Sequence, residues 1–231
     1  MTIYCADIVR AITKPLACCE AWVVSVEDLA RREAEFLRGF MPMARSAIVL
    51  GHHVRTEEEW QWYAGANDNE FCAADDHTLA VCKGLQQALE EHGFPAKIVP
   101  YPRESGLQFR YVAQAAGAGA IGTNAFLLHP GWGPWIHLRV LATVAPAGTG
   151  KKRACDQVCA ACGACVEACP AGAIQDTMFD GLLCRSYRRA KGEYTPVGPR
   201  QELRYCLICA QCCPIGERPQ ARVGTEKQLP S

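Results

Sequence analysis

The stretch CAACGACVEACP, residues 159–170, places four cysteines at short intervals, at Cys159, Cys162, Cys165 and Cys169, with Pro170 directly after the last. Gaps of two, two and three residues before a proline are typical of the bacterial ferredoxin run. In that run three cysteines bind one [4Fe–4S] cluster and the fourth reaches a second cluster. Zinc ribbons, the alternative, pair two CxxC units across a long gap. The spacing therefore predicts iron–sulfur clusters.

A second cysteine group, CLICAQCCP at residues 206–214, supplies the remaining ligands. In two-cluster ferredoxins the cysteine before each proline crosses over to the other cluster. The ligands predicted for the first cluster are Cys159, Cys162, Cys165 and Cys213. Those predicted for the second cluster are Cys169, Cys206, Cys209 and one further cysteine.

Two cysteines compete for the last position, Cys184 and Cys212. Cys212 is the neighbour of Cys213, and adjacent side chains cannot easily face two different clusters. We therefore favour Cys184, although Cys206, Cys209 and Cys212 repeat the CxxCxxC spacing of the first run. We interpret Cys155 as a spare thiol.

The composition of the 231 residues divides the chain near residue 150. Ten of the 15 cysteines lie between Cys155 and Cys213, after a small, flexible and basic segment, APAGTGKKR, at residues 145–153. We predict a first domain over residues 1–150, a two-cluster domain over 151–216 and a polar tail over 217–231. The chain shows no secretory leader and no apolar run of about 20 residues, so clustered cysteines in a reducing cytoplasm indicate metal, and we expect no membrane association.

Helical and strand patterns alternate along the first domain without a regular βαβ order. Apolar periodicity predicts helices over residues 26–39 and 109–116. It predicts a third helix that begins with Asp75 or Asp76 as its N-cap and ends at Gly93. Short apolar or alternating runs predict strands over residues 47–51, 97–99 and 136–144, the last with one more polar face. This mixture favours an α+β fold.

Several motifs in the first domain have an ordinary interpretation. Residues 117–122, GAGAIG, match GxGxxG, but a helical pattern precedes them where a dinucleotide site needs a strand. We interpret these glycines as positions where the backbone passes close to a neighbouring group, such as a cofactor. His52 and His53 end a buried strand, and we identify no third metal ligand for them. Asp75-x-His77 starts like a histidine-ligation motif of corrinoid proteins, but Ala80 stands where that motif has glycine.

The order of these motifs resembles the epoxyqueuosine reductases and, more distantly, the catalytic core of reductive dehalogenases. The resemblance rests on ARSAIVLG (44–51), AGAGAIGTN (116–124), LLHP (127–130), Trp135, the two cysteine groups and CRSY (184–187). It implies a nitroreductase-like domain that binds cobalamin, followed by a two-cluster ferredoxin-like module. It also implies that Cys184, followed closely by Ser186 and Tyr187, is a ligand of the second cluster.

The resemblance further implies roles for residues of the first domain. The implied cofactor-binding residues are Gly117, Gly119, Gly122, Thr123 and Asn124. Thr123 stands where the epoxyqueuosine reductases have a lysine, and Glu104 is the candidate for their acidic proton donor. The chain ends 17 residues after Pro214, so we expect a shortened relative that does not act on tRNA.

The expected function is single-electron delivery through two [4Fe–4S] clusters to a bound cobalamin, for reductive chemistry or corrinoid reduction. The alternatives are a simple ferredoxin-type carrier, an FMN-dependent reductase and an epoxyqueuosine (tRNA) reductase. Expected partners are a redox donor protein, a small-molecule or corrinoid-protein acceptor and a second copy of the chain. With 24 basic and 24 acidic residues, the formal net charge of zero gives no global attraction for nucleic acid, and we expect none as a partner.

Overall fold

The core of the protein is a four-stranded sheet in which every neighbouring pair is antiparallel. The computed structural model describes residues 5–16, 18–65, 70–148, 159, 162–175 and 178–221. The strand order is β1 (Cys19–Ser25), β2 (Ser46–His53), β8 (Ile136–Thr143) and β5 (Ala96–Ile98). β2 and β8 pair over their full length, with Val49 opposite Val140.

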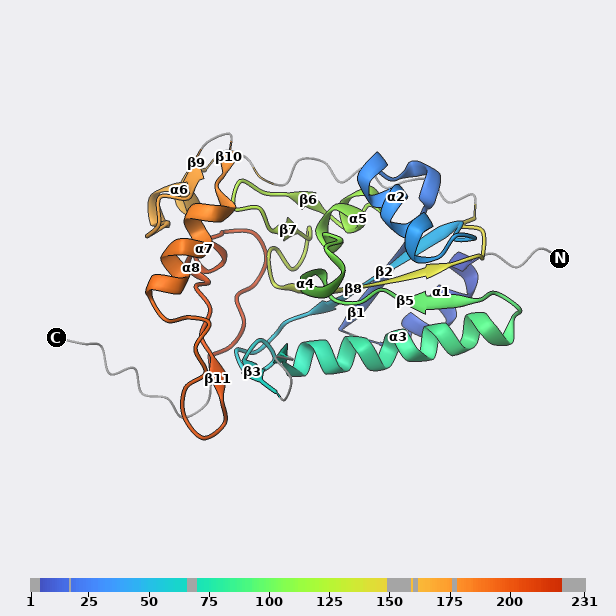
Figure 1. Ribbon diagram of the computed structural model, residues 1–231, viewed down its shortest axis with the longest axis horizontal. Helices are drawn as coiled ribbons and strands as arrows, with labels where there is room; N and C mark the ends of the chain where they lie inside the picture. Colours follow the sequence, from blue (N-terminus) through green and yellow to red (C-terminus); the bar gives the residue numbers. More distant parts are fainter. Residues whose placement is uncertain are drawn as a thin grey trace.

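Helices cover both faces of this sheet (Figure 1). Ile48 and Leu50 of β2 pack against α1 (Cys5–Thr13) and α3 (Ala73–Glu91). The alternate residues Ala47 and Val49 face α2 (Arg31–Phe40) and α5 (Phe109–Ala115). Successive strand side chains point to opposite faces, so one buried strand serves two apolar cores. The predicted mixture of helices and strands is confirmed as a mixed α/β fold.

The predicted helix over residues 26–39 is divided in two. A short 3-10 helix, η1 (Val26–Asp28), follows Ser25, whose hydroxyl accepts a hydrogen bond from the Glu27 amide at 3.4 Å. Leu29 and Ala30 are extended, and α2 begins after them. The apolar spacing of the segment is maintained across the break, which explains why periodicity alone predicted one helix.

The more polar face predicted for β8 is buried inside the protein. His137 and Arg139 are 1% and 8% exposed, because α3 covers this face of the strand. Asp75 of α3 receives hydrogen bonds from both side chains. Asp75 therefore lies inside the first turn of α3, whose N-cap is Cys72, and does not cap the helix as predicted.

The cysteine-rich part forms the end of the molecule opposite the N-terminus (Figure 1). Its described elements are α6 (Ala164–Ala168), β9 (Ile174–Gln175), β10 (Met178–Phe179), α7 (Gly181–Ala190), β11 (Glu202–Leu203) and α8 (Ile208–Gln211). β11 joins a small sheet with β3 (Trp62–Ala64) and β4 (Glu70–Phe71) of the core. Backbone hydrogen bonds also tie Gln220 to Arg55 and Glu57. Two separate segments therefore attach the cysteine-rich part to the core.

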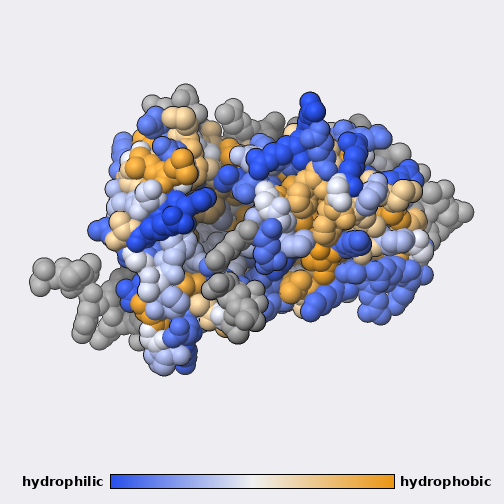
Figure 2. Space-filling model, in the orientation of Figure 1, coloured by the Kyte–Doolittle hydropathy of each residue, from blue (hydrophilic) through white to orange (hydrophobic). Residues whose placement is uncertain are grey.

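Three short elements complete the core near this junction: α4 (Pro102–Ser105) and the hairpin of β6 (Ala120–Ile121) and β7 (Leu127–Leu128). On the face shown in Figure 2, hydrophobic residues gather over the core around α2, and hydrophilic residues surround them. Within the described part of the chain, no helix combines the length and apolar character needed to cross a membrane.

Candidate redox site

The four cysteines predicted for the first cluster meet at one cavity of about 250 Å³. Its lining comprises Asn124, Leu128, Cys159, Cys162, Ala164, Cys165, Cys213, Pro214 and Ile215. α6 begins beside it at Gly163, whose φ of 75° lets the chain turn between Cys162 and Cys165. Thiolates at such spacing are the ligands that iron–sulfur clusters require. The structure brings these four residues together, and the cluster itself stays a prediction.

The cysteines predicted for the second cluster form another group. Burial, together with the neighbouring Cys206, Cys184 and Cys169, raises the pKa of Cys209 to about 12. Burial also raises the pKa of Cys184; Arg188 opposes this, while Cys206 and Cys169 add to it. In a bound cluster, iron takes the place of the thiol protons and compensates the negative charge that burial disfavours.

Cys212 lies between the two groups. Burial raises its pKa, and the thiols that act on it are Cys162 and Cys169, one from each predicted set. Its Sγ lies 3.6 Å from the Cys209 carbonyl oxygen. The choice of Cys184 over Cys212 stays a prediction that these positions favour. Cys155 lies outside the described residues.

Local hydrogen bonds position Cys184 and Cys206. Asp180 caps α7 by accepting hydrogen bonds from the Leu182 and Leu183 amides, each at 2.9 Å. Glu193, just after α7, accepts hydrogen bonds from the Cys206 amide and from Arg188 Nε, each at 2.7 Å. Charge-assisted bonds of this kind are among the stronger ones, so they hold α7 and the Cys206 segment together.

The glycines of residues 117–122 permit close packing within the chain. A Cβ on Gly119 would lie 2.3 Å from the Leu128 carbonyl oxygen, and one on Gly122 would lie 2.5 Å from Leu128 Cδ1. Real Cβ atoms do not approach so closely, so the backbone contact requires glycine at 119, whereas a side chain at 122 would require the Leu128 side chain to shift. The close approach that the sequence predicted occurs here between two strands of the protein, and a cofactor contact stays a prediction.

The β6–β7 hairpin places Thr123 and Asn124 next to the predicted cluster cysteines. Thr123 Oγ1 lies 3.4 Å from Cys159 Sγ. The buried Asn124 side chain donates to the Cys209 carbonyl oxygen at 3.1 Å and accepts from the Phe126 amide at 3.2 Å. These two residues, predicted to contact a cofactor, therefore lie against the predicted cluster ligands.

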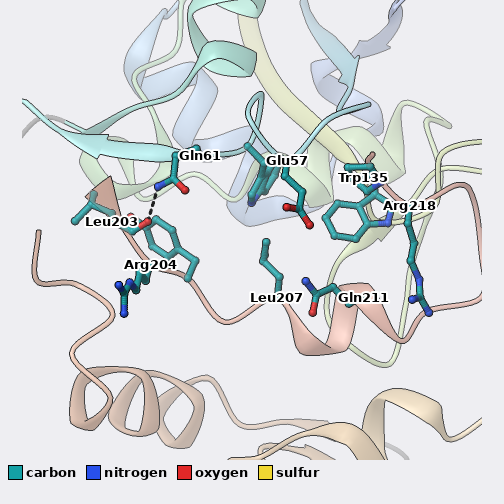
Figure 3. Close-up of a pocket in the computed structure, with 11 residues that line it drawn as sticks. Glu57, Gln61, Trp135, Leu203, Arg204, Leu207, Gln211 and Arg218 are labelled. Atoms are coloured by element: carbon teal, nitrogen blue, oxygen red, sulfur yellow. Dashed lines mark hydrogen bonds between the residues drawn. The ribbon is translucent and has the colours of Figure 1, made fainter. Parts of the chain in front are cut away.

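A larger cavity, of about 630 Å³, opens where the core meets the cysteine-rich part (Figure 3). Residues of the core and of the segment 203–219 line it: Glu57, Trp60, Gln61, Trp135, Leu203, Arg204, Tyr205, Leu207, Gln211, Arg218 and Pro219. Gln61 Nε2 spans the junction by donating to the Leu203 carbonyl oxygen at 2.9 Å. Trp135 Nε1 is buried and has no hydrogen-bond partner among the described residues. No sequence motif indicated this cavity, because Gln61 and Leu203, which line it from opposite sides, are 142 positions apart.

A buried charge network lies in the core near this cavity. Asp75 accepts from His137 Nε2 at 2.8 Å and from Arg139 at 2.7 and 2.6 Å. Burial alone would raise the pKa of Asp75, but the hydrogen bonds and charges of His137 and Arg139 outweigh it and lower the pKa to about 2. Trp60, which lines the cavity, has its ring centroid 5.9 Å from that of His137. Glu104, the predicted proton donor, is exposed on α4 and lines neither cavity.

Comparison with known proteins identifies relatives with reductase activity. No family model matches the chain. The chain is similar to epoxyqueuosine reductase from Gloeobacter violaceus, with 24% identity over 204 residues that cover 84% of this chain and 62% of the relative. The chain thus spans about three fifths of the length of that relative.

Two solved structures share its fold. An epoxyqueuosine reductase bound to a tRNA-Tyr epoxyqueuosine-modified stem loop has a TM-score of 0.65 and 17% identity, covering 90% of this chain and 64% of that one. A reductive dehalogenase whose structure is described in terms of B12-dependent dehalogenation has a TM-score of 0.52 and 17% identity, covering 78% of this chain and 28% of that one. The resemblance predicted from the sequence is confirmed, and these relatives support an oxidoreductase.

The tRNA-bound relative contradicts our expectation that nucleic acid is not a partner. That expectation used the short chain end after Pro214, Thr123 in place of lysine, and the net charge, which is a sum over the whole chain and does not describe local clusters. Residues 178–221 carry seven basic side chains and four acidic ones. Arg204 and Arg218 of this segment line the larger cavity.

Proposed function

We propose that this protein is an iron–sulfur oxidoreductase of the epoxyqueuosine reductase type, which passes electrons through two [4Fe–4S] clusters to a substrate in tRNA. The observation that carries the proposal is the position of α8. Cys209 of this helix belongs to the second cysteine group, while Leu207 and Gln211 line the larger cavity. A cluster at these cysteines would lie one short helix away from a cofactor bound in the cavity.

The cysteines of the proposed clusters divide as the ferredoxin pattern requires. The first cluster would take Cys159, Cys162, Cys165 and Cys213, and the second would take Cys169, Cys184, Cys206 and Cys209. We propose residues 151–216 as the module that holds both clusters. Thr123 and Asn124 would accompany them, because hydroxyl and amide dipoles close to cluster sulfurs tune the reduction potential.

The larger cavity fits a cobalamin in its chemistry. Its volume lies within the range of about 300–1,000 Å³ that is common for cofactor pockets, and its lining is more polar than theirs, which suits the amide arms of a corrin. Trp60, Trp135 and Tyr205 would contact the corrin, and the unpartnered Nε1 of Trp135 would donate to one of its amide oxygens. When bound, cobalamin would supply a cobalt centre that accepts single electrons from the clusters; two electrons and two protons in total would convert the epoxide to an alkene and release its oxygen as water.

Basic residues at the cavity support a nucleic-acid substrate. Phosphate groups are bound by arginine through paired, charge-assisted hydrogen bonds. Arg204 and Arg218 line the cavity on the side of the cysteine-rich part, and Glu57 and Gln61 line it on the side of the core. The arginines would hold the phosphates of a tRNA stem loop at the edge of the cavity, so that the modified base faces the cobalamin bound inside it. Thr123, where the relatives have lysine, leaves this chain without an ammonium group at that position.

The test is conversion of an epoxyqueuosine-modified tRNA stem loop by the anaerobically reconstituted protein, with nucleosides identified by mass spectrometry. We expect product only when iron, sulfide, cobalamin and a chemical reductant have all been supplied. The variant Arg204→Gln/Arg218→Gln should bind the stem loop at least tenfold more weakly, with a smaller salt dependence. Arg31→Gln, an exposed arginine paired with Glu35 on α2, is the matched control and should bind as the wild type does. If the fully loaded protein binds no stem loop and forms no product, the alternative of a plain electron carrier would be supported instead.

A further inference from the structure

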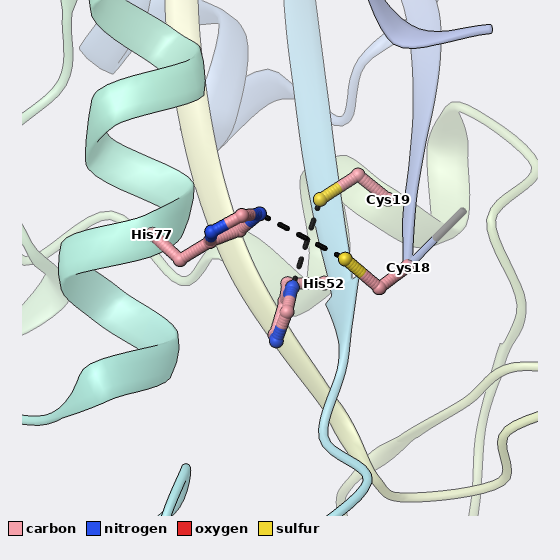
Figure 4. Close-up of side chains that lie close together, drawn as sticks. All are labelled: Cys18, Cys19, His52 and His77. Atoms are coloured by element: carbon pink, nitrogen blue, oxygen red, sulfur yellow. Dashed lines mark hydrogen bonds between the residues drawn. The ribbon is translucent and has the colours of Figure 1, made fainter. Parts of the chain in front are cut away.

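A second group of metal-binding side chains lies in the core, apart from the proposed clusters. Cys18, Cys19, His52 and His77 each direct one ligand atom toward a common point, and these atoms all lie within 4.8 Å of one another (Figure 4). The sequence did not indicate that the cysteines and histidines form one site, because Cys19 and His52 are 33 positions apart. None of the four belongs to the cysteine groups of the redox site.

Three elements assemble the group. Cys19 begins β1 and lies directly opposite His52 in the β1–β2 register. Cys18 precedes the strand, and its carbonyl oxygen accepts a hydrogen bond from the His53 amide at 2.8 Å. His77 comes from the first part of α3, which packs across β2. The backbone therefore fixes the positions of all four side chains independently of any ligand.

The observed separations are close to those of a tetrahedral zinc site. Cys19 Sγ lies 3.6 Å from His52 Nδ1, and Cys18 Sγ lies 3.8 Å from His77 Nε2. With zinc–sulfur bonds of about 2.3 Å and zinc–nitrogen bonds of about 2.05 Å, sulfur and nitrogen ligands of one tetrahedron are about 3.6 Å apart. The two ring centroids are 4.9 Å apart, so the imidazoles lie side by side without clashing.

His52 carries a second feature of metal-bound histidines. Its Nε2, on the side of the ring away from Cys19, is buried and has no hydrogen-bond partner among the described residues. Glu59 Oε2 lies 3.7 Å from this nitrogen. Metal on Nδ1 would fix the proton on Nε2, and a small shift would then let that proton be donated to Glu59.

We propose that Cys18, Cys19, His52 and His77 bind one Zn²⁺ ion as a closed, structural Cys₂His₂ site. The two thiols lose their protons to solvent as two zinc–sulfur bonds form, and the two imidazoles bind as neutral ligands. Thiolate and imidazole together suit zinc better than magnesium or calcium, which take oxygen ligands. The ion would tie the start of β1 and the end of β2 to α3 and would leave no position open for substrate.

The direct test is the zinc content of the cluster-loaded protein after removal of loosely bound metal by a chelator. We expect about one zinc per chain in the wild type and a loss of at least tenfold in zinc affinity in Cys18→Ser and in His77→Gln. His92→Gln, at the other end of α3, and His53→Gln, next to His52, should retain the zinc. The iron content should be the same in all five proteins, which shows that the clusters are formed and that each variant is folded.

A second readout identifies the ligands. Co²⁺ in place of zinc should give a sulfur-to-cobalt charge-transfer band and the intense ligand-field bands of tetrahedral cobalt, and Cys18→Ser should weaken the charge-transfer band. Glu59→Gln should reduce zinc affinity by about 10-fold to 100-fold through His52 while the cobalt spectrum keeps its tetrahedral form. Zinc content unchanged in Cys18→Ser and His77→Gln would overturn the proposal. So would a wild-type protein that takes up neither ion, or one that holds a Cys18–Cys19 disulfide under anaerobic conditions.

Discussion

At the scale of single residues, local spacing along the chain proved the most informative feature. Cys159, Cys162 and Cys165 of the CxxCxxC run line one cavity together with Cys213, the cysteine before the proline of the second group. Short gaps leave the backbone few ways to arrange such ligands, so spacing carries geometric information. The Cys₂His₂ group could not be found in this way, because sheet register and helix packing bring its members together.

The eighth cluster ligand gives the first prediction at this scale. Cys184→Ser should lower the iron content from about eight to about four per chain, because Cys184 lies among Cys169, Cys206 and Cys209. Cys212→Ser, the matched control, should retain about eight. Iron analysis and electron paramagnetic resonance of the two anaerobic variants measure this. Loss of a cluster in Cys212→Ser, with Cys184→Ser intact, would reverse the assignment.

The second prediction concerns Asp75, whose carboxylate neutralises the buried Arg139. Asp75→Asn should lower the free energy of unfolding by about 3–5 kcal/mol, because it leaves a buried guanidinium without its charge partner. The exposed neighbour Asp76 serves as the control, and Asp76→Asn should cost less than about 1 kcal/mol. Chemical denaturation of both variants provides the comparison, and equal effects would show that the buried network contributes little.

At the scale of secondary-structure elements, the sequence predicted segments with strong periodicity and missed those set by tertiary contacts. β2 and β8 were predicted because their apolar runs are buried on both faces. The polar residues of β8 were predicted to share one face, but their burial under α3 and their pairing with Asp75 were not predicted. α1 and β1 were missed, since β1 mixes buried, half-buried and exposed residues without clear alternation.

Docking of the cysteine-rich part gives the prediction at this scale. Gly133 has a φ of 58°, and a Cβ there would lie 1.8 Å from the Ile215 carbonyl oxygen, two residues after Cys213. Gly133→Ala should destabilise the protein by about 1–3 kcal/mol and lower its iron content, because the chain must move away at Ile215. Gly39→Ala has open space in α2 and should be neutral or stabilise by about 0.5–1 kcal/mol. Thermal unfolding and iron analysis of both variants test this, and equal iron retention would argue against a rigid junction.

At the scale of the whole molecule, the proposed function depends on the junction between core and cysteine-rich part. The larger cavity lies there, lined from both sides, and β11 and Gln220 join the two parts on either side of α8. This arrangement could not be predicted from the sequence, because residues 57–61 and 203–219 carry no motif that connects them. The family resemblance indicated the chemistry, whereas the expectation that nucleic acid is not a partner, drawn from net charge, the chain end and Thr123, was wrong.

The most direct test of the electron path is a single-turnover reoxidation experiment without external reductant. Protein loaded with iron, sulfide and cobalamin is reduced, freed of reductant and mixed anaerobically with an epoxyqueuosine-modified tRNA stem loop, and the reduced clusters are followed by electron paramagnetic resonance. We predict that the cluster signals disappear only when cobalamin and the modified stem loop are both present, and that queuosine forms in proportion to the electrons lost. Clusters that stay reduced with both present, or that reoxidise equally with an unmodified stem loop, would contradict the proposed function.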